Sequence, residues 1–201
     1  MVLRSLFLAP MVSVLGMAQT VDFGVQAQLT LPGGDLKQRT EGTSVGLGSQ
    51  VRWNLSRGHA VVAKADYTAF NGHRSVYGPY GYVEETTREA LISLGADYNY
   101  YLSRQVGQGF YVGGGLGALH MRVHAIPSHS FLFRDDTDQT KTRLYFDLNL
   151  GMALNRRVNV FLRTLVFGDE LQGSSSNGNS GETRSSYSLS TTFALGAEFH
   201  F

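Results

Sequence analysis

The sequence lacks cysteine entirely and is poor in proline and in charge: four prolines, and 16% charged residues among 201. Without cysteine, neither a disulfide framework nor a thiolate metal site can form. The charged fraction lies well below the roughly 25% that is usual for a soluble domain. Beyond the N-terminal residues, no stretch is apolar enough to span a bilayer as a helix. These absences exclude a disulfide-stapled protein and, beyond the N-terminal residues, membrane-spanning helices.

Residues 1–18 have the organisation of a secretory signal peptide. Arg4 supplies the basic region, a short apolar core follows, and small residues stand at Gly16 and Ala18. The apolar run is shorter than the roughly 20 residues that a membrane-spanning helix needs. We therefore expect cleavage after Ala18, which leaves residues 19–201 as one mature domain. Without Arg4 the acidic and basic residues are equal in number, so no overall field would attract nucleic acid, and we expect no nucleic-acid partner.

Apolar and polar residues alternate with period two along the whole mature chain. The first run alternates Val21, Phe23, Val25 and further apolar residues with polar ones, and such alternation predicts a β-strand with one apolar face. Eight runs of this kind predict an all-β protein. The runs span residues 21–31, 43–55, 60–70, 89–102, 110–120, 143–154, 158–167 and 186–201.

The two faces of these predicted strands differ in charge. With each strand set in its best phase, the apolar face carries no charged residue. The opposite face carries Asp22, Arg52, Lys64, Asp66, Glu89, Asp97, Arg143, Asp147, Arg163 and Glu198. Strands of soluble barrels usually have five or six residues, whereas membrane-spanning strands need about 9–11, apolar outward and polar inward. The strand lengths favour the membrane type, in which a closed barrel satisfies every backbone hydrogen bond.

The connections between the runs alternate between long and short. The long ones are residues 32–42, 71–88, 121–142 and 168–185, and the short ones are 56–59, 103–109 and 155–157. Membrane barrels of bacteria have long loops on the extracellular side and short turns on the periplasmic side. The sequence therefore predicts an eight-stranded antiparallel up-and-down transmembrane β-barrel with both termini in the periplasm.

The last predicted strand is apolar at every second position and ends on phenylalanine. It resembles the C-terminal signal of bacterial outer-membrane barrels, with Phe193, Leu195, Phe199 and Phe201 as the signal residues. The glycine-rich run 110–117 resembles the fifth strand of OmpA-like and OmpX-like barrel domains, where inner-face glycines make room for bulky neighbours. The resemblance covers the barrel domain only, so peptidoglycan anchoring is not expected. It implies residence in the outer membrane of a Gram-negative bacterium, delivery by periplasmic chaperones and insertion by the barrel assembly machinery.

The expected interior contains charges of both signs. Lys64 and Asp66 lie two residues apart and point the same way, Asp97, Asp147 and Arg163 are expected at similar depth, and Arg163 is the expected partner of Asp147. Arg52 and Glu198 are expected near the periplasmic end. Buried charges must pair, and eight strands enclose a space that side chains can fill. We interpret this set as a structural network; a narrow path for ions or other solutes is the alternative.

Histidines raise a second alternative, a lipid-A-modifying enzyme of the deacylase or acyltransferase type. A deacylase needs a serine activated by a histidine that a carboxylate orients. His120, His124, His129 and Ser130 lie near one predicted loop, but His129 and Ser130 are adjacent and would point to opposite faces. His200 lies at the periplasmic mouth, away from the outer leaflet. We therefore expect no enzyme.

The predicted loops complete the functional reading. Acidic residues 135, 136 and 138 lack the spacing and glycine of a calcium-binding loop, so neither a metal nor a cofactor is expected. Residues 173–181 are rich in glycine and serine, and Tyr77, Tyr80 and Tyr82 lie among glycines, a composition that suits binding surfaces. We expect a monomeric, non-enzymatic barrel that contributes to envelope integrity, contacts membrane lipids and lipopolysaccharide, and displays its loops for adhesion or surface binding.

Overall fold

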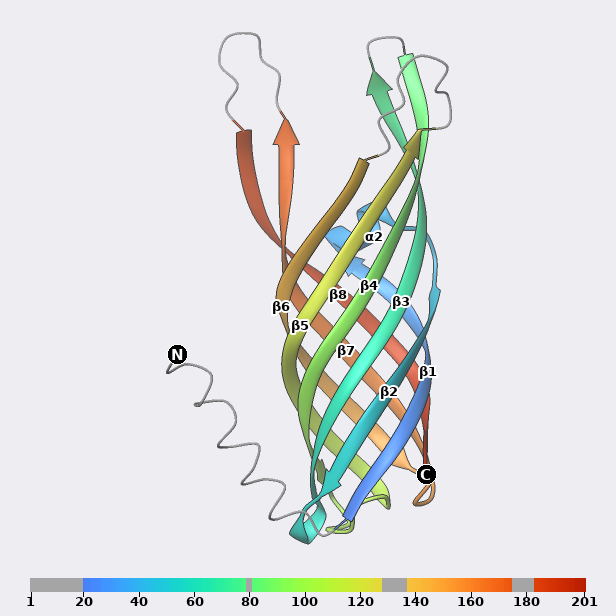
Figure 1. Ribbon diagram of the computed structural model, residues 1–201, viewed down its shortest axis with the longest axis vertical. Coiled ribbons are helices and arrows are strands. Elements are labelled where there is room, and N and C mark those ends of the chain that lie inside the picture. The colour runs from blue at the N-terminus through green and yellow to red at the C-terminus, as the bar shows by residue number, and fades with distance from the viewer. Residues whose placement is uncertain (1–19, 79–80, 128–136, 175–182) are drawn as a thin grey trace.

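The computed structural model describes residues 20–78, 81–127, 137–174 and 183–201. These form a single closed barrel in which each strand pairs antiparallel with the next and β8 pairs with β1. Figure 1 shows the strands tilted around a common axis. The predicted fold class is confirmed. The strands are β1 Thr20–Gly34, β2 Ser44–Asn54, β3 His59–Gly78, β4 Gly81–Tyr101, β5 Gly109–Pro127, β6 Thr137–Ala153, β7 Val158–Ser174 and β8 Thr183–His200.

The alternation in the sequence becomes an inner and an outer face. On β6, Leu144, Phe146 and Leu148 point outward and are 81%, 52% and 56% exposed, whereas the intervening Tyr145 and Asp147 are buried. The other strands alternate in the same way, so the outer surface is a belt of leucine, valine and phenylalanine. Apolar side chains in contact with lipid need no protein partner, which is why so many large apolar residues lie exposed.

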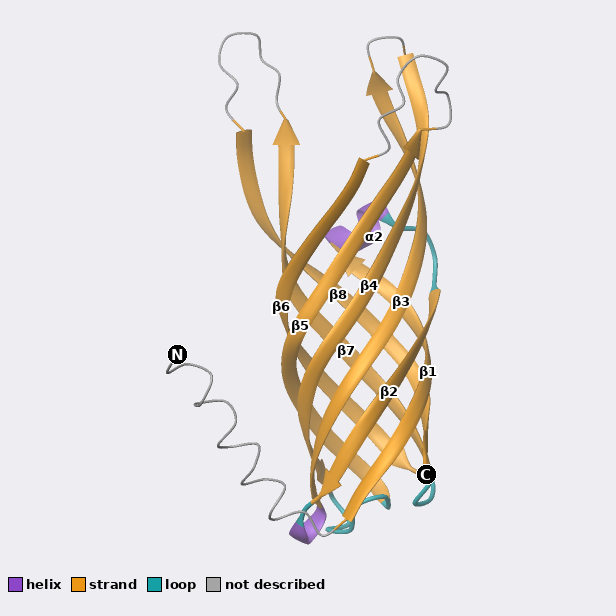
Figure 2. Cartoon of the chain, in the orientation of Figure 1, coloured by secondary structure: helices purple, strands orange, loops and turns teal. Residues whose placement is uncertain are grey.

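The strands continue well beyond the predicted membrane-spanning parts at the end opposite the C-terminus. Residues 71–88 were expected to form a loop, but β3 and β4 remain paired as far as Gly78 and Gly81. The expected loops 121–142 and 168–185 are likewise partly strand, through β5–β6 and β7–β8 (Figure 2). The prediction was wrong there because strands that leave the membrane meet water on both faces. The apolar alternation then disappears, although backbone pairing continues.

The first long connection also differs from the prediction. A short helix, α2 Asp35–Arg39, follows β1 directly. Its Leu36 is fully buried, and Thr40 closes the turn by donating from both its backbone N–H and its hydroxyl to the Leu36 carbonyl. Figure 2 shows α2 at the upper end of the closed barrel. No helix in the described residues is long and apolar enough to cross a membrane.

The three short connections agree with the prediction. They comprise the 3-10 turn η1 Ser56–Gly58, residues 102–108 and residues 154–157. The C-terminus and the start of β1 lie at this same end of the barrel (Figure 1). All short turns therefore lie on one side of the barrel and all long hairpins on the other.

Candidate functional site: the barrel interior

The centre of the barrel holds a cluster of charged side chains from four strands. Lys64 on β3 lies between the carboxylates of Asp97 on β4 and Asp147 on β6, with its Nζ 2.5 Å from Asp97 Oδ2 and in an ion pair with Asp147 Oδ2. All three side chains are buried. Asn149 donates to Asp97 Oδ2 at 3.0 Å. One ammonium thus serves two carboxylates.

The second cation of the cluster is Arg163 on β7. Its Nη1 lies 2.8 Å from Asp66 Oδ2 and its Nη2 donates to Gln26 Oε1 at 3.2 Å. Gln26 in turn donates to the other oxygen of Asp66. The expected pairing of Arg163 with Asp147 is only peripheral, because the Nε–Oδ2 distance is 4.0 Å. Lys64, not Arg163, is the principal partner of Asp147.

Glycines on the inner faces of the strands make room for this cluster. Gly115 lies in register between Asp97 and Asp147, and a Cβ on it would lie 2.2 Å from Asp97 Oδ1 and 2.8 Å from Asp147 Oδ1. A Cβ on Gly48 would overlap Asp66 in the same way, at 2.2 Å from its Oδ1. Any side chain at these positions would displace a carboxylate, so the glycines shape the space in which the ion pairs form.

An aromatic layer lies below the charged cluster, toward the short turns. The rings of Tyr101 and Tyr111 lie 5.0 Å apart between centroids, and both belong to a buried cluster with Phe161. The guanidinium carbon of Arg163 lies 4.9 Å from the Phe161 ring centroid. This cation–π contact joins the aromatic layer to the charged cluster.

A second polar group closes the end near the short turns. Arg52 pairs with Asp22, with Nη2 2.8 Å from Oδ2, and its Nη1 lies 3.2 Å from the Tyr101 hydroxyl and from His200 Nε2. Glu198 lies 3.4 Å from the same imidazole nitrogen and accepts from Asn159 at 3.0 Å. Arg52 and Glu198 therefore both lie in the interior at the end of the barrel that carries the termini.

The upper interior contains a large apolar cluster, which the sequence analysis did not anticipate. Leu36 of α2 packs there among inward-facing residues of β3 to β7. The cluster consists of Leu36, Phe70, Leu91, Leu119, Met121, Tyr145, Leu165 and Phe167. The sequence did indicate this cluster. Its strand residues are apolar, and they fall on the inward-facing positions of the two-residue alternation in each strand. Glu89, the register partner of Phe70, is also buried at this level. From the short turns upward, the interior therefore consists of a polar, an aromatic, an ionic and a largely apolar layer.

The histidines considered for catalysis do not come together. His120 is on the outer face, where its Nδ1 lies 3.1 Å from Thr142 Oγ1. His200 is at the opposite end of the barrel interior. His129 and Ser130 lie outside the described residues, as do acidic residues 135 and 136. Within the described ranges, no three histidine or acidic side chains are grouped as metal ligands.

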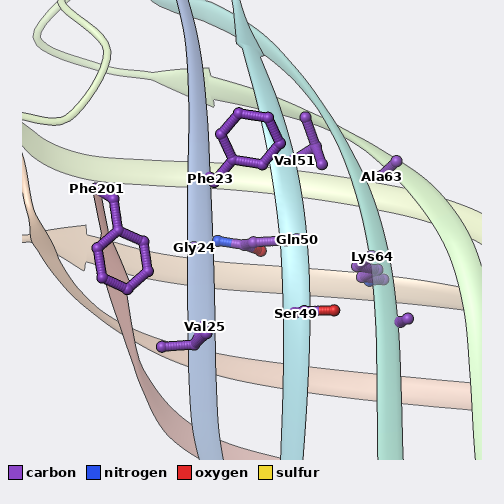
Figure 3. Close-up of a pocket in the computed structure, with 10 residues that line it drawn as sticks. Phe23, Gly24, Val25, Ser49, Gln50, Val51, Ala63, Lys64 and Phe201 are labelled. Carbon is purple, nitrogen blue, oxygen red and sulfur yellow. The ribbon is translucent and has the colours of Figure 1, made fainter.

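The residues of the expected assembly signal form an outward stripe on β8. Phe193, Leu195 and Phe199 are 50%, 56% and 41% exposed, and Phe201 is 73% exposed. Phe199 and Phe201 make an edge-to-face contact with ring centroids 5.2 Å apart. Figure 3 shows Phe201 beside β1, where its backbone N–H donates to the Phe23 carbonyl at 2.8 Å. The ring of Phe201 therefore contributes little to the packing of the folded barrel.

Comparisons with known proteins identify the fold. No family model matches the chain, and no curated protein does. Solved structures do match. Neisserial surface protein A has a TM-score of 0.53 and 13% identity over 91% of this chain and 100% of that one. Ail, the attachment invasion locus protein of Yersinia pestis, in complex with the heparin analogue sucrose octasulfate, has a TM-score of 0.52 and 13% identity over 90% and 97%.

A third similar structure is the outer-membrane protein OprG of Pseudomonas aeruginosa, with a TM-score of 0.51 and 15% identity over 92% of this chain and 97% of that one. At such identities the likeness extends to the fold alone. Each match spans nearly the whole length of both chains, so what is shared is the complete barrel. The chain therefore has the fold of the eight-stranded, OmpA/OmpX-like transmembrane barrels of the bacterial outer membrane.

Proposed function

We propose that this protein is a non-enzymatic barrel of the bacterial outer membrane that contributes to envelope integrity and displays its long hairpins outward for adhesion or surface binding. The observation that carries the proposal is the filled interior. Four layers of side chains occupy it, from the Arg52–Asp22 pair at one end to Leu36 at the other. A filled interior leaves the lipid-facing belt and the hairpins as the surfaces on which the protein acts.

The belt supports a role in the envelope. It consists of large apolar side chains that are about half exposed, such as Leu116 and Leu162 at 69% and 57%. In a bilayer this surface contacts acyl chains. We infer that the N-terminal residues direct export and that periplasmic chaperones and the barrel assembly machinery deliver the chain. Membrane lipids and lipopolysaccharide then become its permanent neighbours, with the barrel as a monomer.

The hairpins support the display of a binding surface. Three of them extend beyond the barrel on the side opposite the C-terminus (Figure 1). Among the similar structures, Ail is an attachment protein by name and was crystallised with a heparin analogue. Heparin-like polyanions and host matrix proteins are therefore the first ligands to test on this chain.

Cells that express the protein, or a variant with residues 175–182 replaced by a short glycine linker, provide the test. Adhesion to immobilised heparin and to matrix proteins is expected to fall in the variant, while resistance to detergent stays equal, because integrity depends on the barrel. If cells with the unchanged protein, cells with the variant and cells without the protein all adhere equally, the proposal that the hairpins act in adhesion is contradicted. Equal detergent resistance with and without the protein would contradict the envelope role.

The two alternatives, a lipid-A-modifying enzyme and a narrow channel, predict different experimental results. An enzyme would change the mass of lipid A in cells that express it, and a channel would produce ohmic steps in planar bilayers. Against the enzyme, the described partners of the His200 ring are Gln50, Arg52, Asn159 and Glu198, which include no serine, threonine or cysteine nucleophile. Against the channel stands the buried ion cluster at the centre of the barrel. We therefore expect unchanged lipid A and no steps.

A further inference from the structure

The three short turns share a sequence pattern. Each begins with leucine, continues with serine or asparagine, and places arginine third. The three copies are Leu55-Ser56-Arg57, Leu102-Ser103-Arg104 and Leu154-Asn155-Arg156. Leu102 and Leu154 are 59% and 56% exposed at the end of the apolar belt, and all three arginines are exposed. At each turn, the arginine therefore lies two residues beyond the leucine that marks the edge of the lipid-facing surface.

The three turns pack side by side. A Cβ on Gly58 of the first turn would lie 2.7 Å from the Arg104 Cα of the second, and a Cβ on Gly107 of the second would lie 3.4 Å from the Arg156 Cα of the third. These close approaches bring the repeated arginines together at the base of the barrel. Arg57, Arg104 and Arg156 all line one polar pocket there, together with Arg52.

The positive charge at this base is not balanced. The turns contain no aspartate or glutamate, and Arg157 adds a fourth exposed arginine. Asp22 is the only acidic residue that lines the pocket, and it already pairs with Arg52 and accepts from Asn54 at 2.6 Å. Within the described part of the chain, the turn arginines form no ion pair with an acidic side chain. A chain whose mature part is neutral overall thus carries a cationic patch at one end.

Backbone conformation gives a separate indication. Arg57 and Arg104 have φ angles of 60° and 61°, and among the described residues they are the only ones other than glycine with positive φ. The left-handed region disfavours side chains with a Cβ, and glycine would adopt it without that strain. Arg57 and Arg104 are each the third residue of the repeated turn, so arginine occupies the same strained position twice. This indicates that the guanidinium groups serve a function.

We propose that the three Leu-Ser/Asn-Arg turns bind the phosphate groups of anionic phospholipids in the leaflet that they face. This inference rests on the insertion of the barrel into a bilayer, which is part of the proposed function. The leucine lies in the acyl region, and the long arginine side chain reaches the headgroup depth. Guanidinium groups bind phosphate through paired hydrogen bonds, and clustered basic residues at a membrane surface attract anionic lipid.

Trp53 provides a probe at the right place. It is the only tryptophan of the chain and lies on β2, two residues before Leu55. The full barrel would be reconstituted in phosphatidylcholine vesicles that contain brominated phosphatidylglycerol or, in a parallel series, brominated phosphatidylcholine. Quenching of Trp53 then reports which lipid lies beside the first turn. We expect stronger quenching by the anionic lipid, with an association about fivefold stronger for each arginine that contributes.

The decisive variant replaces the three repeated arginines by glutamine: R57Q, R104Q and R156Q. Its preference for the anionic lipid is expected to fall steeply, to at most the roughly fivefold that the remaining Arg157 could contribute. The matched control removes three exposed cations of the opposite end by K37Q, R88Q and R122Q, and it should keep the preference. The heat-modified mobility of the folded barrel on gels checks that both variants fold.

Several results would overturn the proposal. Equal quenching by both brominated lipids in the unsubstituted protein, or an unchanged preference in the turn variant, would remove the lipid site while leaving membrane insertion intact. A preference abolished by millimolar inorganic phosphate would assign the pocket to a free anion instead of a headgroup. The absence of quenching by either lipid would refute insertion itself, and the proposed function with it.

Discussion

Replacing Leu148 by arginine tests which face of the barrel meets lipid. Leu148 is 56% exposed and lies in the middle of the outward residues of β6, which run from Leu144 to Met152. Its neighbour Asp147 is fully buried on the other face. Arginine at the bilayer midplane of such barrels costs about 2–4 kcal/mol, and the cost falls to about 0–1 kcal/mol near the interfaces. Leu148→Arg should therefore destabilise the barrel by about 2–4 kcal/mol.

Urea titration of the barrel in lipid vesicles, followed by tryptophan fluorescence, measures this cost. Leu144→Arg is the matched control, because Leu144 is even more exposed, at 81%, but lies four residues nearer the upper edge of the belt. At about 3.4 Å of rise per residue, and with the strands tilted, that places it about 10 Å from the midplane. The reasoning fails if both substitutions cost the same, or if Leu148→Arg costs nothing in lipid.

Three further predictions concern the interior, assembly and sidedness. Lys64→Met should destabilise the barrel by about 3–5 kcal/mol because it leaves buried carboxylates unpaired, and adding Asp147→Asn should recover part of that loss; strict additivity in a double-mutant cycle would contradict the pairing. Deleting Phe201 should lower the amount of barrel in the outer membrane while refolding in detergent stays normal; normal levels in cells would rule out its role in assembly. An epitope inserted after Asn177 should be stained on intact cells; staining only after permeabilisation would reverse the topology.

Which residues of each strand point outward is predictable because a single property, contact with lipid, decides it. A membrane-spanning strand has lipid on one side, and lipid admits no unpaired charge, so the outer face of β6 reads Leu144, Phe146, Leu148, Leu150 without interruption. Since the side-chain period is two, fixing one face also fixes the other. The positions of Lys64 and Asp147 on the inner face follow directly.

Partners across the barrel are harder to predict, because they depend on how far each strand is shifted against the next. Asp147 lies opposite Leu165 on β7, and the residue of β7 that faces Asn149 is Arg163. Arg163 therefore lies level with Asn149, the next inward-facing residue of β6 after Asp147, and it pairs with Asp66 instead. Lys64 reaches Asp147 from the other side of the barrel interior. The register is set by all eight strands together, so it cannot be predicted from the sequence pattern of one strand at a time.

The upper interior escaped prediction for a different reason. Phe70, Leu119 and Phe167 are apolar at positions where the rule for membrane barrels expects polar side chains. The rule describes water-filled or ion-paired interiors, and it does not apply where a helix closes the barrel. Five residues of helix, flanked by glycine and threonine, show no amphipathic repeat that would reveal α2 in advance.

Burial of Leu36 separates the first connection from the other three. The strands of β3–β4, β5–β6 and β7–β8 stay paired beyond the upper apolar cluster, so changes in these outer paired residues leave the interior layers untouched. The first connection instead supplies a side chain with no exposed surface to the upper apolar cluster. Truncating a buried leucine costs about 2–5 kcal/mol, a large part of the stability of a domain. Substitutions are therefore expected to be tolerated better in the three hairpins than in residues 35–40, which are constrained by the packing of the barrel itself.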